Sequence, residues 1–193
     1  MVRYRLLAVF APVLLMLTAC GVNSIPTAEE EAKARWADVQ TELQRRNDLI
    51  GNLVETVRGF ANQERDVLRE VTQARASATQ VMVTGEQLTD PAAMARLAEA
   101  QGRLNISLQR LQEAYPELTS QRNFESLQVQ LEGTENRIGR ARERYNAAVQ
   151  SYNTTIRTFP AVIGARIIYG SQPMAPFEAT PESQRAPEVN FSR

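Results

Sequence analysis

The sequence predicts an all-α protein that folds as a long antiparallel up-and-down helical bundle. Three observations support this fold class. Apolar residues recur at alternating spacings of three and four, which is typical of amphipathic helices that face partner helices. Prolines and helix-capping residues stand at the ends of the later stretches. The segments between them are short, so consecutive helices are expected to be antiparallel neighbours.

The longest apolar stripe covers residues 28–84 and predicts one long helix, with Gly85 as its stop signal. Of its fourteen positions, only Arg46 and Glu64 are polar. The apolar members are Trp36, Val39, Leu43, Ile50, Leu53, Val57, Phe60, Val67, Val71, Ala74, Ala78 and Val81.

A second helix is predicted to begin at Pro91, because Asp90 can cap it and proline suits the first helical position. Pro116 is expected to end this helix. Gln101 is the exception on a stripe that otherwise contains Met94, Leu97, Leu104, Leu108, Leu111 and Tyr115.

A third helix is predicted to begin between Thr119 and Phe124 and to end before Pro160. Its stripe follows the same spacing through Phe124, Leu127, Leu131, Thr134, Ile138, Ala141, Tyr145, Ala148, Tyr152, Thr155 and Phe159.

The three predicted helices differ in length, at roughly 85, 38 and 55 Å for 1.5 Å per residue. Neither of the others can match the first along its whole length. The first helix must therefore project as a stalk, or bend near Gly51 or Gly59, where a missing side chain weakens a helix. A bend would give a bundle of four helical rods.

The amino terminus has the features of a processed, lipid-modified segment. Two arginines precede an uncharged run over residues 6–17, which is too short to cross ~30 Å of hydrocarbon but suits a secretory signal. The following LTAC, which ends at Cys20, resembles the lipobox of bacterial lipoproteins. The resemblance implies a signal peptide over residues 1–19 and a diacylglyceryl group on Cys20. The alternative is an uncleaved amino-terminal anchor, and both alternatives attach the chain to a membrane.

Composition divides the rest of the chain into three parts. Residues 20–27, CGVNSIPT, predict a lipid-anchored tether, and residues 28–166 predict the bundle. Residues 167–193 predict an extended tail, because the last 23 residues contain four prolines and no periodicity. The strongly apolar side chains of the tail can dock it onto the bundle or onto a partner, and they are Phe177, Val189 and Phe191.

Several chemistries are excluded by composition. The chain has no histidine and one cysteine, so a Cys/His zinc site, a disulfide framework and a Ser-His-Asp triad are excluded. Glu132 and Glu135 share a helix face, but no histidine accompanies them, and neither a metal nor a cofactor is expected. With 22 basic and 22 acidic residues, the chain has no charge excess that would favour nucleic acid. The protein is not expected to be an enzyme.

Polar residues on or near the apolar stripes are candidate site residues. Burying Arg46 or Glu64 alone would cost several kcal/mol, so each must be paired or lie at the edge of the core. One interpretation is a set of polar contacts that fixes helix register, and the other is a polar pocket or partner contact. The candidates are Arg46, Asp48, Asn52, Glu55, Glu64, Glu135, Asn136, Asn146 and Asn153.

Three stretches carry short motifs that are jointly specific. Residues 36–75 contain the motif QRR-DLI-NLVETV. Residues 115–160 contain two motifs, NF--LQ--L-GTENRI and YN-----YN, and residues 177–182 read FEATPE. Together they resemble the LemA family, whose members commonly have proline where this chain has Gly51. The resemblance implies an antiparallel helical bundle anchored to a bacterial membrane by an amino-terminal segment or a lipid. Some members are tied to organelle formation in magnetic bacteria, and no catalytic residues come with the family.

The expected function is therefore a non-enzymatic scaffold or adaptor for other envelope or membrane proteins, which can also form homo-oligomers. Its expected location is the bacterial cell membrane or the outer membrane, with the bundle on the extracytoplasmic side and the lipid on Cys20 as anchor. The alternative is a sensor of a small ligand or ion that uses the polar cluster inside the bundle.

The lipid anchor makes a prediction for the mass of the protein extracted from membranes. Wild-type protein should have the mass of residues 20–193 plus lipid, and Cys20→Ala should lack the lipid because no thiol remains to be acylated. Intact mass spectrometry checks this. A wild-type chain that retains Met1 and carries no lipid would instead identify the first segment as an uncleaved anchor.

Overall fold

The computed structural model describes residues 2–60, 65–116 and 121–178, and every regular element in these ranges is helical. The long helices are α1 (Val2–Phe60), α2 (Arg65–Gln80), α3 (Pro91–Ala114) and α4 (Arg122–Thr155). Shorter elements are the 3₁₀ turn η1 (Gly85–Thr89), the single turn α5 (Ala161–Gly164) and the π-helical turn η3 (Ala165–Tyr169).

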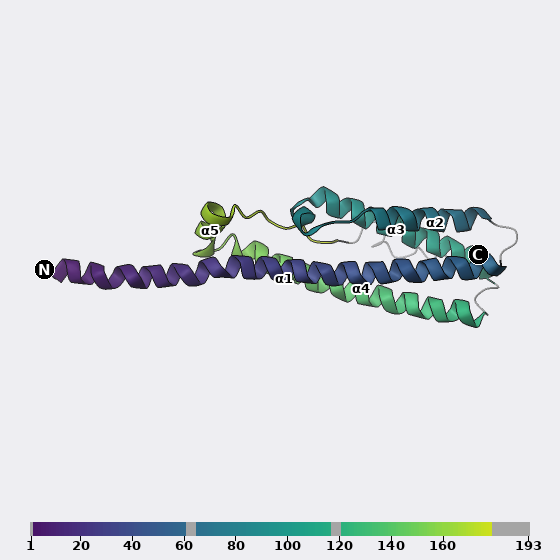
Figure 1. The fold of residues 1–193 in the computed structure, drawn as a ribbon, viewed down its shortest axis with the longest axis horizontal. Helices are drawn as coiled ribbons and strands as arrows, with labels where there is room; N and C mark the ends of the chain where they lie inside the picture. Colours follow the sequence, from purple (N-terminus) through teal and green to yellow (C-terminus); the bar gives the residue numbers. More distant parts are fainter. Residues whose placement is uncertain (1, 61–64, 117–120, 179–193) are drawn as a thin grey trace, which may run out of the picture.

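The helices form an antiparallel bundle of four rods (Figure 1). α1 and α4 run in opposite directions and make the most extensive contact in the molecule, while α2 and α3 pair beside them. This arrangement confirms the predicted all-α fold class, including the four-rod form that a change of direction in the first helix would produce.

The predicted long helix over residues 28–84 is divided by a reversal of the chain. α1 ends at Phe60, directly after Gly59, and α2 begins at Arg65 and runs back along α1 (Figure 1). The two halves of the first apolar stripe therefore lie on α1 and α2, which pack against each other. This leaves a shorter part of α1 without a partner helix.

The other candidate for a bend, Gly51, lies inside uninterrupted helix. A Cβ atom there would lie 3.0 Å from Nη2 of Arg75 on α2. Arg75 uses this space to donate from Nε to the backbone oxygen of Asn47 at 2.7 Å. The glycine thus permits the close approach of α2 to α1.

The predicted amino-terminal boundary of α3 is confirmed. The carboxylate of Asp90 accepts a hydrogen bond from the backbone nitrogen of Ala92 at 2.9 Å, and Pro91 is the first helical residue. α3 ends at Ala114, ahead of Pro116 as predicted.

Two other boundaries differ from the sequence prediction. α2 ends at Gln80, and an extended stretch at 81–84 precedes η1. In that stretch Val83 is buried and its oxygen accepts from Nε1 of Trp36 at 2.8 Å, which draws the chain away from the α2 axis. α4 ends at Thr155 and gives way to turns before Pro160.

The buried apolar side chains form two clusters along the bundle. One gathers around Trp36 and Tyr145, and the other around Leu53 and Leu104. On α1, Arg46 stands between the two clusters. The stripe positions predicted to be core residues are buried on both sides of it, namely Trp36, Val39, Leu43, Ile50, Leu53 and Val57.

The amino-terminal part of α1 extends beyond the rest of the bundle (Figure 1). Residues 20–27, expected to form an irregular tether, are helical, and Ile25 is fully buried in the first core cluster together with Ala161 and Ala165. The bundle therefore begins before residue 28, because the turn at α5 covers this part of α1. Within the described residues, we find no helix with the length and apolarity needed to cross a bilayer.

The chain is extended after η3 as far as Glu178, and it lies along the bundle. Gly170 has a φ of 56° and redirects the chain at the end of η3. Phe177 is buried in the first core cluster, so this part of the predicted tail docks on the bundle. Val189 and Phe191 lie outside the described residues.

Candidate functional site

The first part of the candidate site is a polar cluster at the middle of the bundle, centred on Arg46. Because Arg46 occupies a position of the apolar stripe, α1 directs its side chain inward, and only 2% of the residue is exposed. Nη1 donates to Oε1 of Glu135 on α4 at 2.5 Å and to Oδ1 of Asn105 on α3 at 3.1 Å. One guanidinium group therefore joins three helices through short, charge-assisted contacts.

The polar cluster is only partly satisfied by protein groups. Nε and Nη2 of Arg46 are buried without a hydrogen-bond partner in the described structure, as is Oε1 of Gln101. An unpaired buried polar atom costs about 1–3 kcal/mol. The unpaired atoms include both donors and acceptors, so a small polar species with both kinds of group could satisfy them.

A cavity of about 220 Å³ lies beside this cluster. Two arginines and two carboxylates are among its lining residues, which include Arg46, Gln101, Asn105, Glu135, Arg142 and Glu178. Burial lowers the pKa of Arg142, and the charge of Glu135 opposes this shift. The two guanidinium groups are matched by two carboxylates, so the lining favours a polar occupant without a preference for either charge.

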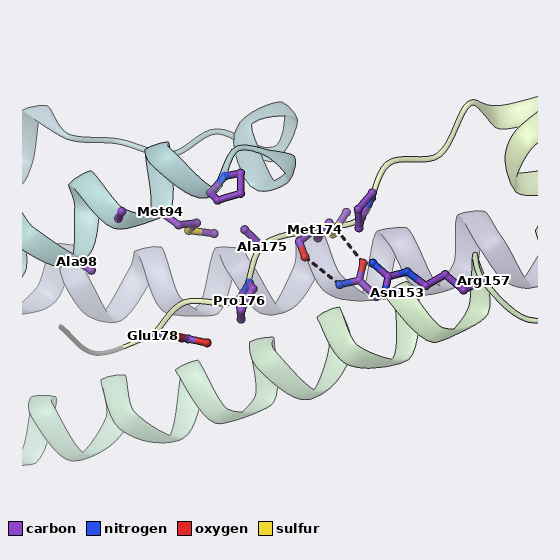
Figure 2. Close-up of a pocket in the computed structure, with 11 residues that line it drawn as sticks. Met94, Ala98, Asn153, Arg157, Met174, Ala175, Pro176 and Glu178 are labelled. Carbon is purple, nitrogen blue, oxygen red and sulfur yellow. Dashed lines mark hydrogen bonds between the residues drawn. The ribbon is translucent and has the colours of Figure 1, made fainter. Parts of the chain in front are cut away.

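The second part of the candidate site is the seat of the C-terminal segment, residues 171–178, on α4. The side-chain amide of Asn153 donates to the backbone oxygen of Met174 and accepts from its backbone nitrogen, both at 2.9 Å (Figure 2). Asn146 makes the same pair of contacts with Phe177, at 3.2 Å to the oxygen and 2.8 Å from the nitrogen. Each asparagine thus acts as the partner that a neighbouring β-strand would provide.

The spacing of the two asparagines explains why both pairs form. Seven residues of α-helix rise ~10.5 Å, and three residues of extended chain span ~10 Å. Asn153 pairs with Met174 and Asn146 with Phe177, so the segment runs antiparallel to α4. These contacts involve only main-chain atoms of the segment and therefore do not depend on its side chains.

Aromatic side chains fasten the end of the segment. The ring of Phe177 packs edge-on against Trp36, with centroids 5.7 Å apart, and the guanidinium of Arg142 lies 4.9 Å from the same ring. The hydroxyl of Tyr145 donates to the oxygen of Ala175 at 2.8 Å. The nitrogen of Ala175 donates in turn to the oxygen of Leu88 at 2.7 Å, which joins the segment to η1.

A groove of about 480 Å³ runs along one side of the seated segment (Figure 2). Met94 and Ala98 from α3 form one wall, and Asn153 from α4 and Arg157 from the turn after it form the other. Met174, Ala175 and Pro176 complete the groove, so most of its lining is apolar. The arrangement is suited to an extended chain with small or apolar side chains.

The structure brings four of the predicted site residues into these two parts. Arg46 and Glu135 meet in the polar cluster, and Asn146 and Asn153 meet the C-terminal segment. The side chain of Cys20, and Glu64 as a whole, lie outside what the structure describes.

The remaining predicted members have exposed side chains outside the cluster, and they are Asp48, Asn52, Glu55 and Asn136. Residues two and six positions after Arg46 are rotated by roughly 200–240° around the helix, so they face away from the core. They make local contacts instead: Asp48 accepts from Nε2 of Gln44 at 2.9 Å, and Glu55 pairs with Arg58 at 2.8 Å.

Sequence reasoning missed several participants. Asn105 lies beside the apolar stripe of α3 and carries no sequence signal. Gln101 interrupts that stripe, as Arg46 does on α1, and this interruption could have identified it. Arg142 was also not among the sequence candidates, yet it packs on Phe177. Among the described residues, no group of three or more acidic, cysteine or histidine side chains is placed to bind a metal.

Comparison of the amino-acid sequence with known proteins finds one family profile and several relatives. The sequence profile described as the LemA family matches residues 35–191. Magnetosome protein MamQ of Magnetospirillum gryphiswaldense is 28% identical over 157 residues, which cover 72% of this chain and 58% of the relative. Magnetosome proteins MamQ 2 and MamQ 1 of Paramagnetospirillum magneticum are each 27% identical over the same share. The chain thus spans less than two thirds of the length of these relatives.

The seat predicts how the C-terminal segment responds to loss of its asparagine partners. Asn153→Ala should raise amide hydrogen exchange at Met174, and the further change Asn146→Ala should raise it at Phe177, because each change removes two hydrogen bonds. Exchange of residues 171–178 is measured by mass spectrometry. Asn136→Ala, at an exposed position of α4, is the control. Equal exchange in all variants would show that these side chains do not hold the segment.

Because the hydroxyl of Tyr145 is buried, we expect the protein to lose stability at alkaline pH. Burial raises the pKa of its hydroxyl above the ordinary value of about 10, and burial also raises the pKa of Tyr152. Above about pH 10 the unfolded chain releases protons that the folded chain retains, so the free energy of unfolding should fall as pH rises.

Tyr145→Phe should lower stability near neutral pH by about 0.5–1.5 kcal/mol, because its bond to Ala175 is lost. The same variant should lose less stability than wild type between about pH 9 and pH 11. Urea titrations across this range measure both effects, with the exposed Tyr169→Phe as control. Parallel pH profiles for wild type and Tyr145→Phe would contradict the argument.

Proposed function

The chain belongs to the LemA family, and from this membership, together with the site, we propose that it is a membrane-anchored scaffold or adaptor that acts without catalysis. LemA and MamQ proteins form a membrane-associated family. The proposed partners are other envelope or membrane proteins, including further copies of the chain. The proposed anchor is a lipid on Cys20, with the bundle on the extracytoplasmic side of the membrane.

The observation that carries the proposal is the way the bundle binds an extended segment. Asn146 and Asn153 bond to the main chain of that segment, and a largely apolar groove lies beside it. Main-chain hydrogen bonds combined with apolar pockets are a general means of binding extended peptides. A surface of this kind suits an adaptor, because it can accept a chain segment from a partner as well as its own.

The dimensions of the bundle also support a scaffold. The 34 residues of α4 rise ~51 Å, and α1 is paired with this helix in the bundle. The ion pair between Arg46 and Glu135 and the two apolar clusters hold α1 and α4 together as a rod. A rod anchored at one end presents binding surfaces at a set distance from the membrane.

A second candidate function is a sensor of a small ligand, and the buried unpaired atoms favour it. Nε and Nη2 of Arg46 and Oε1 of Gln101 lack partners near a cavity of about 220 Å³. A ligand with both a hydrogen-bond acceptor and a hydrogen-bond donor would match them. Asn52, Glu55 and Asn136 do not belong to this version of the site, because their side chains are exposed elsewhere.

Photo-crosslinking of the full-length chain in its native membrane tests the scaffold. A benzophenone amino acid is placed at exposed apolar positions, Ile106 on α3 and Val129 on α4. The buried neighbour Leu104 is the matched control, since a probe there can reach only the chain itself. We expect reproducible adducts with one membrane protein or a second copy at the exposed positions, and none at Leu104.

The absence of adducts at both exposed positions would contradict the scaffold. Inorganic phosphate added to the purified chain tests the second candidate in parallel. A rise in melting temperature that Arg46→Met abolishes would favour the ligand sensor over the adaptor, because binding to the folded state stabilises it.

A further inference from the structure

One end of the bundle carries an exposed apolar patch. Eight large hydrophobic side chains are exposed in the described structure, and five of them fall within residues 159–169. We call these five the apolar end patch: Phe159, Ile163, Ile167, Ile168 and Tyr169, with exposed fractions of 79, 50, 79, 63 and 44%. Single exposed apolar residues need no explanation, but a contiguous group of this size marks an interaction surface.

The patch is built on α5 and η3, which turn the chain back after α4. Ala161 and Ala165 face inward and pack with Ile25 of α1 in the first core cluster. The outward side chains of the same two turns, including Ile163 and Ile167, are therefore left in solvent. Because the inward residues are fully packed, the outward ones have no room in the core.

The position of the patch matches the point at which the chain reaches a membrane. α1 leaves the bundle beside α5, and its amino-terminal part continues beyond every other element (Figure 1). Cys20 precedes Ile25 by five residues, or ~7.5 Å of helix. Whether the anchor is a lipid on Cys20 or the uncleaved segment before it, the turns that carry the patch begin to contact α1 within about two helical turns of the anchored residue.

The turn that carries the patch is basic. No acidic residue occurs between Glu143 and Glu178, and the exposed Arg157 and Arg166 lie beside and within the patch. The nearest carboxylates belong to α1 and η1: Glu29 and Glu30 lie 2.7 and 3.0 Å from Nζ of Lys33, Glu31 lies 2.7 Å from Arg35, and Glu86 lines the same hollow as Tyr169. Basic residues next to exposed aliphatic and aromatic side chains are typical of segments that enter the membrane interface.

We propose that the apolar end patch inserts into the headgroup region of an anionic bilayer next to the anchor. The inference rests on the proposed membrane anchorage and adds a second point of attachment. Aliphatic side chains enter the acyl boundary, Phe159 and Tyr169 lie at headgroup level, and the arginines contact lipid phosphates. Two attachment points would fix the tilt of the bundle, which a single point of attachment cannot do.

Tryptophan quenching by brominated lipid tests the insertion in the full-length chain. The native Trp36 is 2% exposed and gives a constant background. Tyr169→Trp is the reporter, since one aromatic residue replaces another, and Val129→Trp, at an exposed site near the start of α4, is the control. Each chain is reconstituted in vesicles of phosphatidylglycerol and brominated phosphatidylcholine, and flotation verifies that it is bound.

We expect a blue shift and loss of most of the added emission for Tyr169→Trp, and little change for Val129→Trp. Adding Phe159→Glu and Ile167→Glu to the Tyr169→Trp chain should remove the quenching, because charged groups at these exposed positions oppose insertion without disturbing the core. Circular dichroism verifies that the glutamate variant is folded.

A chain that floats with the vesicles but shows equal quenching at residues 169 and 129 would contradict the insertion of the apolar end patch. The proposed anchor would not be affected by this result. A second copy covering the patch would give this result. Quenching that persists in the glutamate variant would also overturn the proposal. A chain that does not float would contradict the proposed anchorage, and the patch with it.

Discussion

The buried guanidinium of Arg46 constrains the arrangement of the other helices. A charge removed from water must be paired, and here the partners come from two other helices, Glu135 on α4 and Asn105 on α3. Sliding α4 by one heptad would move its carboxylate by ~10.5 Å and leave the charge unpaired. Apolar packing on either side tolerates more than one register, so the polar layer selects one of them.

The seat of the C-terminal segment follows from this register. Trp36 of α1 and Tyr145 of α4 face one another, with ring centroids 5.0 Å apart, only when the two helices are aligned as they are. Their rings form the surface on which Phe177 packs. Asn146 and Asn153, which bond to the segment, lie on the same side of α4. The polar contacts of Arg46, the ring contact between Trp36 and Tyr145 and the seat of the segment therefore follow one another along the bundle.

The surface at one end of the bundle agrees with the family to which the chain belongs. LemA membership places the chain among membrane-associated proteins, and the described structure has an apolar, acid-free turn where α1 emerges. Between the ends, a largely apolar groove lies beside the C-terminal segment. The proposed scaffold function rests on this groove and on the elongated form of the bundle.

The sequence by itself determined the all-helical fold class, the capped start of α3 and most of the residues that face the core, because periodicity and capping are local properties of the chain. Asp90 and the stripe from Trp36 to Val57 are examples. It also singled out Arg46, Glu135, Asn146 and Asn153. Only the tertiary structure decided what they touch: Asn105 and Gln101 join the polar cluster, and the asparagines bind the backbone of Met174 and Phe177. These pairings join residues from about twenty to ninety positions apart, and helical periodicity contains no information on how one helix is aligned with another.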